Sequence, residues 1–131
     1  MKKVVQGMRI KRGNNLDTYH GEVENGVPNG RGLVREDNGT IYEGEWKDGE
    51  KVGKGTMYFS NGDMLIANWD IYPFYGIWRL ADGWVYEGDF NGNWNMHGCG
   101  KMTSPSGEIT KGMWEDGQFK RSGFVPPERK L

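Results

Sequence analysis

The chain has 131 residues, the usual length of one domain, and its 17 basic and 18 acidic residues nearly cancel. That balance provides no field that would favour nucleic acid or an acidic membrane as the main partner. Twenty-two glycines with only five prolines exclude collagen, and 13% aromatic residues argue against disorder. This composition favours short strands, tight turns and large rings that rest on bare backbone.

Signals for export or membrane insertion are missing from the sequence. Cys99 is the only cysteine, which excludes an intramolecular disulfide and favours a reducing compartment. Met1-Lys2-Lys3 is followed by Val4-Val5 alone before polar residues return, and no apolar run approaches the roughly 20 residues of a membrane span. We therefore expect an intracellular, cytoplasmic protein without a transmembrane segment.

Residues 1–18 are predicted to be an N-terminal partial repeat or capping hairpin, because Gly7 to Leu16 reads as the second half of an unpaired unit. Basic residues gather at both ends of the chain: Lys2, Lys3, Arg9, Lys11, Arg12, Arg129 and Lys130. Two interpretations stay open. The charges protect the edges of a sheet against addition of another sheet, which we favour, or they make a weak contact with anionic lipid or an acidic partner.

An internal repeat begins at Tyr19. The segment Tyr19-His-Gly-Glu-Val-Glu-Asn-Gly26 recurs 23 residues later as Tyr42-Glu-Gly-Glu-Trp-Lys-Asp-Gly49. Gly30-Arg-Gly32 and Asn38-Gly39 recur at the same offset as Gly53-Lys-Gly55 and Asn61-Gly62. A fixed period of this length is typical of an array in which each unit is one supersecondary structure.

Three further units follow with losses. The third runs from Leu65, has Gly76 at the place of Gly53, and reaches its Asp82-Gly83 turn two residues early. The fourth, from Tyr86, fits the pattern if one residue is inserted near Asn93, and the fifth, from Thr110, decays at Gly123. We expect an array over 19–123, divided into 19–41, 42–64, 65–85, 86–109 and 110–123, with a tail at 124–131.

Each complete unit reads as a β-hairpin. Ile41–Trp46 and Lys54–Phe59 have strand length, and the pairs Asp48-Gly49, Asn61-Gly62, Asn38-Gly39 and Asp82-Gly83 accept the positive φ of hairpin turns. No helical period of convincing length is present. The sequence therefore predicts an all-β protein with about ten or more strands in one antiparallel sheet.

Alternation along the strands assigns side chains to faces. It places Tyr42, Gly44 and Trp46 on one face and Glu43 and Glu45 on the other. On the returning strand it groups the glycines with two apolar residues: Gly53, Gly55, Met57 and Phe59. We expect the bare glycines, Gly55 above all, to make room for a neighbouring aromatic ring.

The pattern Y-x-G-x-W-x-x-G, then G-x-G, then N-G or D-G, resembles the MORN (membrane occupation and recognition nexus) repeat over residues 19 to 123. Repeat 2 matches throughout, whereas repeat 1 has Val23 in place of tryptophan. The resemblance implies hairpins stacked side by side into one elongated, twisted, often curved antiparallel sheet. It implies a scaffold function at cytoskeletal or membrane sites, or as a regulatory segment of a larger enzyme. Some members bind a helix or peptide in a concave groove, and some are linked to phospholipids.

Catalytic and metal-binding constellations do not assemble. His20 and His97 lie in different repeats, and His97-Gly98-Cys99 supplies at most half of a zinc site. The G-x-G pairs run into strands rather than a helix, which does not suit a phosphate loop. Carboxylates recur at positions that a soluble outer face explains: Glu22, Glu43, Glu45, Glu87 and Asp89. We expect no enzyme activity, cofactor or metal.

The aromatic residues carry the functional signal. They pack adjacent hairpins together, and an aromatic face left partly open usually marks an interaction site. Repeat 3 adds rings where the pattern has glycine, with Tyr72 at the place of Gly49 and Trp78 at the place of Gly55. The predicted partner-binding residues are Trp46, Trp69, Tyr72, Phe74, Tyr75, Trp78, Trp84, Tyr86, Phe90 and Trp114.

Three functions remain open at this point. We favour a non-catalytic protein-binding scaffold that docks a partner helix or peptide, or another copy of the chain, on its aromatic face. The alternative is a peripheral phospholipid or membrane tether that uses the basic end segments. A regulatory fragment of an enzyme is the third, and nothing that resembles a catalytic domain follows residue 123.

Overall fold

The computed structural model describes residues 2–126 and contains eleven β-strands and no helix in that part of the chain. The strands run as follows: β1 Lys2–Arg12, β2 Asn15–Glu24, β3 Val27–Arg35, β4 Ile41–Lys47, β5 Glu50–Tyr58, β6 Met64–Asp70, β7 Tyr72–Arg79, β8 Val85–Phe90, β9 Met96–Thr103, β10 Ile109–Glu115 and β11 Gln118–Ser122. The all-β prediction is confirmed. The basic residues Arg129 and Lys130 lie outside the described residues.

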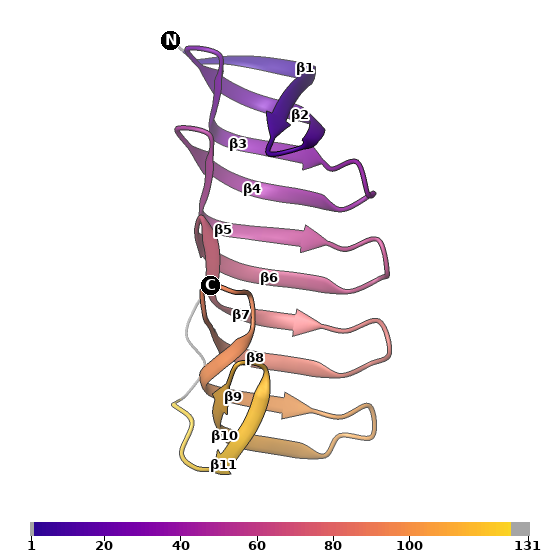
Figure 1. The fold of residues 1–131 in the computed structure, drawn as a ribbon, viewed down its shortest axis with the longest axis vertical. Helices are drawn as coiled ribbons and strands as arrows, with labels where there is room; N and C mark the ends of the chain where they lie inside the picture. Colours follow the sequence, from indigo (N-terminus) through magenta and orange to yellow (C-terminus); the bar gives the residue numbers. More distant parts are fainter. Residues whose placement is uncertain (1, 127–131) are drawn as a thin grey trace.

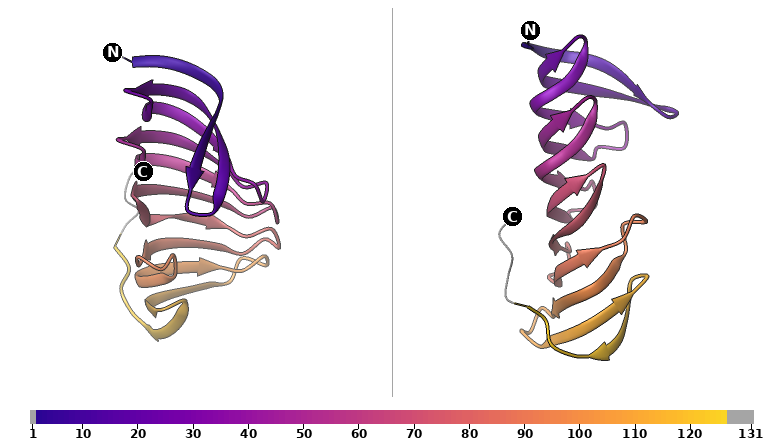
Figure 2. Two further views of the ribbon diagram at one scale, coloured as in Figure 1. Left: turned by 45° about the horizontal axis from the view of Figure 1, so that its top comes forward. Right: turned by 90° about the vertical axis from the view of Figure 1, so that its left-hand side faces the viewer.

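All strands belong to one antiparallel sheet, in which spatial order equals sequence order from β1 to β11. Each pair of neighbouring strands is therefore joined by a hairpin connection, and the sheet is open rather than closed into a barrel. The molecule is elongated along the direction in which the strands stack (Figure 1). The strands twist and bend along their length, so the sheet is curved (Figure 2). The predicted single elongated, twisted sheet is confirmed.

The strands end along two long edges of the sheet, and each of these edges has its own kind of turn. On one edge, Asn38-Gly39, Asn61-Gly62 and Asp82-Gly83 sit in turns where the glycine has positive φ and donates its N–H three residues back. On the other edge, Asn25-Gly26, Asp48-Gly49 and Asp116-Gly117 form two-residue turns with positive φ at both positions. That geometry requires residues that tolerate the left-handed region, which explains the Asx-Gly pairs. The predicted turns are confirmed.

Most returning strands contain a β-bulge near their start. In β5, Gly53 and Lys54 are extra residues, because Gly44 pairs with Gly55 while Glu45 pairs with Val52. Gly53 has a φ of +61° and is exposed, so the expectation that it shares a face with Gly55 is wrong. Because the bulge adds two residues, it interrupts the alternation at Gly53 and leaves it in phase on either side, so that Lys51 lies on the buried face with Gly55 and Met57.

Carboxylates fasten these bulges from the opposite face. Glu45 accepts the backbone N–H of Lys54 at 3.0 Å, and Glu22 accepts the N–H of Arg31 at 2.7 Å. Asp89 does the same for Cys99 at 3.3 Å in the fourth repeat. The recurring acidic residue therefore satisfies an N–H that the bulge removes from the ladder, in addition to keeping that face polar.

Candidate partner-binding surface

The face that carries Tyr19, Tyr42 and Tyr86 is the core of the protein, and we call it the inner face. Rings from successive hairpins meet edge to face along it, with centroids 5.6 Å apart for Tyr19–Trp46, 5.4 Å for Tyr42–Trp46 and 5.2 Å for Tyr42–Trp69. The last repeats continue the series with Tyr86–Trp114 at 5.5 Å. Edge-to-face pairs in this range are favourable beyond the area that they bury.

The polar atoms of these rings are also satisfied. Trp46, Trp69 and Trp114 each donate the indole N–H to the carbonyl oxygen of a glycine 14 residues earlier, at 3.0–3.2 Å. Tyr19 and Tyr86 donate their hydroxyls to the carbonyl oxygens three residues later, at 2.6 and 2.7 Å. Each ring is thereby fixed to the sheet at its polar end and to its neighbours at its apolar part.

Burial changes the ionisation of the tyrosines. Desolvation, helped by the nearby Glu22 carboxylate, raises the pKa of Tyr19 from 10.0 to about 12. Desolvation also raises the pKa values of Tyr42 and Tyr86, with the carboxylates of Glu45 and Asp89 acting in the same direction. The inner face is thus a dry environment that keeps its hydroxyls neutral.

The structure divides the ten predicted partner-binding residues into two groups. Six are buried: Trp46, Trp69, Tyr75, Tyr86, Phe90 and Trp114. Five of these belong to the inner-face core, whereas Tyr75 is buried on the opposite face, paired with Asn68 and Asp89. Because packing within the chain already covers the inner-face rings, an accessible surface is left only to the remaining four residues.

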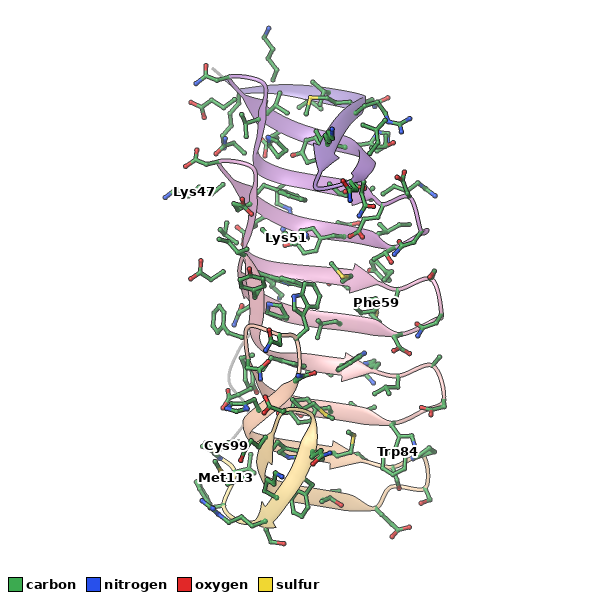
Figure 3. All side chains as sticks on the ribbon, viewed as in Figure 1. Lys47, Lys51, Phe59, Trp84, Cys99 and Met113 are labelled. Carbon is green, nitrogen blue, oxygen red and sulfur yellow. The ribbon has the colours of Figure 1, made fainter. Side chains whose placement is uncertain are left out.

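The predicted partner-binding residues of repeat 3 do not form one patch in the structure. Trp78 is half-buried on the inner face against Phe59 and Phe90. Trp84, which is 40% exposed, lies in the turn after β7 and on the edge opposite to Lys47 (Figure 3). The hairpin between β6 and β7 sends Tyr72 and Phe74 to the Lys47 edge, because residues at the two ends of a strand reach opposite edges of the sheet.

The register of β7 also corrects the alignment of repeat 3. Gly76 pairs with Ala67 and Gly88, and so occupies the place of Gly55 rather than Gly53. Trp78 then stands where Met57 stands in repeat 2, opposite Leu65 and Tyr86. A turn of one residue at Ile71 and a bulge of one residue at Phe74 account for the two missing positions. In the fourth repeat the extra residue lies in the loop 91–95, as predicted.

The β6–β7 turn is the largest local departure from the repeat. Ile71, Tyr72 and Phe74 are 45%, 50% and 50% exposed. Ile71 has a φ of +66° and alone forms the turn that an Asx-Gly pair forms elsewhere, with its N–H bonded to Lys51 as the Gly49 N–H is bonded to Pro28. A β-branched residue in this region is a genuine outlier. Sequence analysis missed Ile71, although its alignment with Asp48 was the signal that could have found it.

A second departure lies in the adjacent loop 91–95. Trp94 has a φ of +65° and donates its N–H to Asn91, at the turn position that glycine fills on the opposite edge. Its ring lies 5.2 Å from the ring of Trp69, so packing holds the strained backbone in place. Repeats 3 and 4 therefore carry both apolar residues with positive φ on the same edge.

The polar groups that sequence analysis considered for chemistry have structural partners. His20 and His97 accept the backbone N–H groups of Gly7 and Asp116 through Nδ1, at 3.0 and 3.4 Å. The Cys99 thiol contacts the Met113 sulfur at 3.7 Å. Within residues 2–126, no three His, Cys, Asp or Glu side chains gather in a way that could hold a metal ion.

With this geometry established, the comparison with known families is decisive for the fold. The MORN repeat profile matches residues 19–40, 42–64 and 86–109, which is more than half of the chain. The chain belongs to the MORN repeat family. Repeats 3 and 5 lie outside the matched ranges, in agreement with their irregular hairpins. The search among curated proteins found no match to this sequence.

MORN repeats are generally non-enzymatic modules associated with protein and membrane binding. The described part of the chain contains no helix that is long and apolar enough to cross a membrane.

Proposed function

We propose that this MORN array is a non-catalytic protein-binding scaffold, and that its partner docks on the β6–β7 turn. We call the exposed residues Ile71, Tyr72 and Phe74 the turn patch. The observation that carries the proposal is the exposure of three large apolar side chains within four positions of a turn that other repeats build from Asx and glycine. Exposed tyrosine and phenylalanine on a rigid turn are typical interface anchors.

The cost of the turn supports a functional origin. A residue held in a sparsely populated backbone region costs about 1–3 kcal/mol, and asparagine or glycine at position 71 would avoid most of that cost. The turn is held in position because the Ile71 N–H donates to the carbonyl oxygen of Lys51 at 2.8 Å. Backbone strain that the surrounding structure maintains is common at binding sites.

The test replaces Phe74 with a photocrosslinking residue in the full chain and irradiates the protein in its native cells. We expect covalent capture of a defined protein, and loss of that capture when Tyr72→Ser is added. The matched control places the crosslinker at Trp84, which has similar exposure on the opposite edge. An unchanged melting temperature for Tyr72→Ser shows that folding is intact. Equal capture from positions 74 and 84, or capture that ignores Tyr72→Ser, contradicts the proposal.

A lipid tether remains the second candidate because of one observation: Lys2, Lys3, Arg9 and Lys11 are all exposed on or beside the edge strand β1. Basic residues near an anionic membrane contribute about 1 kcal/mol each. Co-sedimentation with phosphatidylserine vesicles tests it. Salt-sensitive binding that Lys3→Glu and Lys11→Glu abolish supports the tether, and absence of binding at low salt excludes it.

A further inference from the structure

The edge that holds the turn patch carries more acidic than basic residues beside that patch, with Asp48, Glu50 and Asp70 against Lys47 and Lys51. Five carboxylates lie on or beside the turns at 47–50, 70–74, 91–95 and 115–118: Asp48, Glu50, Asp70, Glu115 and Asp116. Lys47 is the one basic residue within these segments. Asp48, Glu50 and Asp70 are exposed and flank Ile71, whose N–H bonds to Lys51. The apolar turn patch is therefore bordered by negative charge.

The opposite charge lies on another part of the same chain. The β1–β2 hairpin, residues 2–24, contains five basic residues, all in β1, against three acidic residues in β2, of which Asp17 is buried. The strands β1 and β2 form a hairpin at one end of the molecule (Figure 1). Two apolar side chains of this hairpin are exposed: Val4 at 75% and Leu16 at 44%. A basic hairpin with apolar side chains is the chemical complement of an acidic edge with an apolar patch.

The two surfaces cannot meet within one molecule. Four strands, β2 to β5, separate β1 from β6, which at about 4.8 Å per strand places the hairpin and the turn roughly 24 Å apart. A contact between them therefore joins two copies of the chain. It is heterologous, because each copy contributes a different surface, and repeated contacts of this kind build a ring or an open filament.

We propose that the basic β1–β2 hairpin of one copy docks on the turn patch of another, so that the protein assembles with itself end to side. This inference rests on the proposed binding role of the turn patch and names its occupant. The edge strand β1 also presents unpaired backbone groups on the side away from β2, and these join the contact.

Two charge-reversal variants of the full chain test the contact. The hairpin variant is Lys3→Glu with Lys11→Glu, and the edge variant is Glu50→Lys with Asp70→Lys; all four side chains are exposed. Matched controls are Glu43→Lys and Lys111→Glu, which are exposed positions outside both surfaces. The readout is the mass distribution from sedimentation velocity as protein concentration rises. Circular dichroism confirms that each variant is folded.

We expect the natural chain to assemble at about 0.1 M salt and to dissociate at about 1 M, where the Debye length falls from about 10 Å to about 3 Å. Each double variant alone should bind itself about tenfold more weakly or worse. An equimolar mixture of the two should assemble again, because the unchanged hairpin of the edge variant fits the unchanged edge of the hairpin variant, and the two reversed surfaces also carry opposite charges. The controls should assemble like the natural chain.

Three results overturn the inference. They are a natural chain that stays monomeric at low salt, double variants that assemble like the controls, and a mixture that forms no mixed complex. If the chain is monomeric while crosslinking at position 74 still captures another protein, the proposed function stands and only this occupant is wrong. If the hairpin variant loses vesicle binding and assembly is absent, the hairpin serves a lipid surface instead.

Discussion

The glycine at position 55 gives the most direct test of how the inner face is built. A Cβ placed on Gly55 meets three atoms of the Tyr42 side chain, including Cζ at 2.5 Å and Cε1 at 2.6 Å. The ring has no free path, because Trp46 and Trp69 lie edge-on to it at 5.4 and 5.2 Å. Gly55→Ala therefore forces a fully buried ring to move. This confirms the expectation that an aromatic ring lies against Gly55.

The magnitude follows from these contacts. Moving Tyr42 disrupts two edge-to-face pairs at about 0.5–1.5 kcal/mol each, and an extra methyl group in a packed core costs about 1–3 kcal/mol. The lower entropy of alanine in the unfolded chain returns about 0.4–1 kcal/mol. We expect Gly55→Ala to lower the free energy of unfolding by about 2–4 kcal/mol in urea titration, with an unchanged m-value. Gly92→Ala is the matched control, because a Cβ there meets nothing within 4 Å.

A double-mutant cycle refines the test. In repeat 3, leucine replaces the tyrosine at position 65 and alanine replaces the glycine at position 67, which pairs with Gly55 and Gly76. Ala67 stands at the place of Gly44, where a Cβ would also meet the Tyr42 hydroxyl, so repeat 3 already combines loss of the ring with gain of a methyl group beside it. In a Tyr42→Leu background, Gly55→Ala should cost less than about 1 kcal/mol. Strictly additive costs would refute the idea that the tyrosine ring is what requires glycine.

Three other predictions concern the turns, the bulges and the tyrosines. Ile71→Asn should raise the free energy of unfolding by about 1–2 kcal/mol, measured by urea titration, because asparagine tolerates the positive φ that strains isoleucine; a loss of stability would show that the turn is unstrained. Glu45→Ala should cost about 0.5–1.5 kcal/mol because the Lys54 N–H loses its acceptor, whereas Glu45→Gln and Glu43→Ala should stay within about 0.5 kcal/mol; equal costs for the two alanine variants would argue against the bulge contact. The raised pKa values of Tyr19, Tyr42 and Tyr86 mean that their contribution to stability is complete below the unfolded value of 10.0 and is lost as pH rises through the folded value, about 12 for Tyr19. The melting temperature should therefore hold up to about pH 10 and fall steeply above it, together with tyrosinate absorbance; a tyrosinate transition that is complete before the melting temperature falls would contradict this.

Most of the fold could be predicted from the repeat period. Asx-Gly pairs and alternation were sufficient to predict hairpins, turns and the antiparallel sheet, because these features depend on residues close in sequence. The bulges were not predictable in this way. Gly53 looks like a partner of Gly55 by simple alternation, and only the pairing of Glu45 with Val52 shows the two extra residues.

The surface was harder to predict than the fold, for a physical reason. A ring at a repeat position can be buried by the next hairpin or left open, and sequence spacing does not distinguish these outcomes. Trp46 and Tyr86 are covered because each finds edge-on partners one hairpin away. Tyr72 and Phe74 stay exposed because Tyr72 is the first residue of β7, paired with Asp70 beside the turn, and Phe74 is the bulge residue of the same strand. Exposure was decided by the register of β7, which depends on which two positions the repeat had lost.

A repeat array allows one unit to depart from the pattern without loss of the fold. Each hairpin contacts only its neighbours, so a strained turn at Ile71 lowers the stability of one unit and leaves the pairing of β4 with β5 intact. Most departures in repeats 3 and 4 share one edge: a one-residue turn, Trp94 at a position that suits glycine, and three exposed apolar side chains, whereas Trp84 is a lone exposed ring on the other edge. Loss of pattern by neutral change would scatter over both edges and would favour polar residues in turns. Their concentration beside a row of carboxylates is the reason to look for a binding surface on the rim of this sheet rather than on its aromatic inner face.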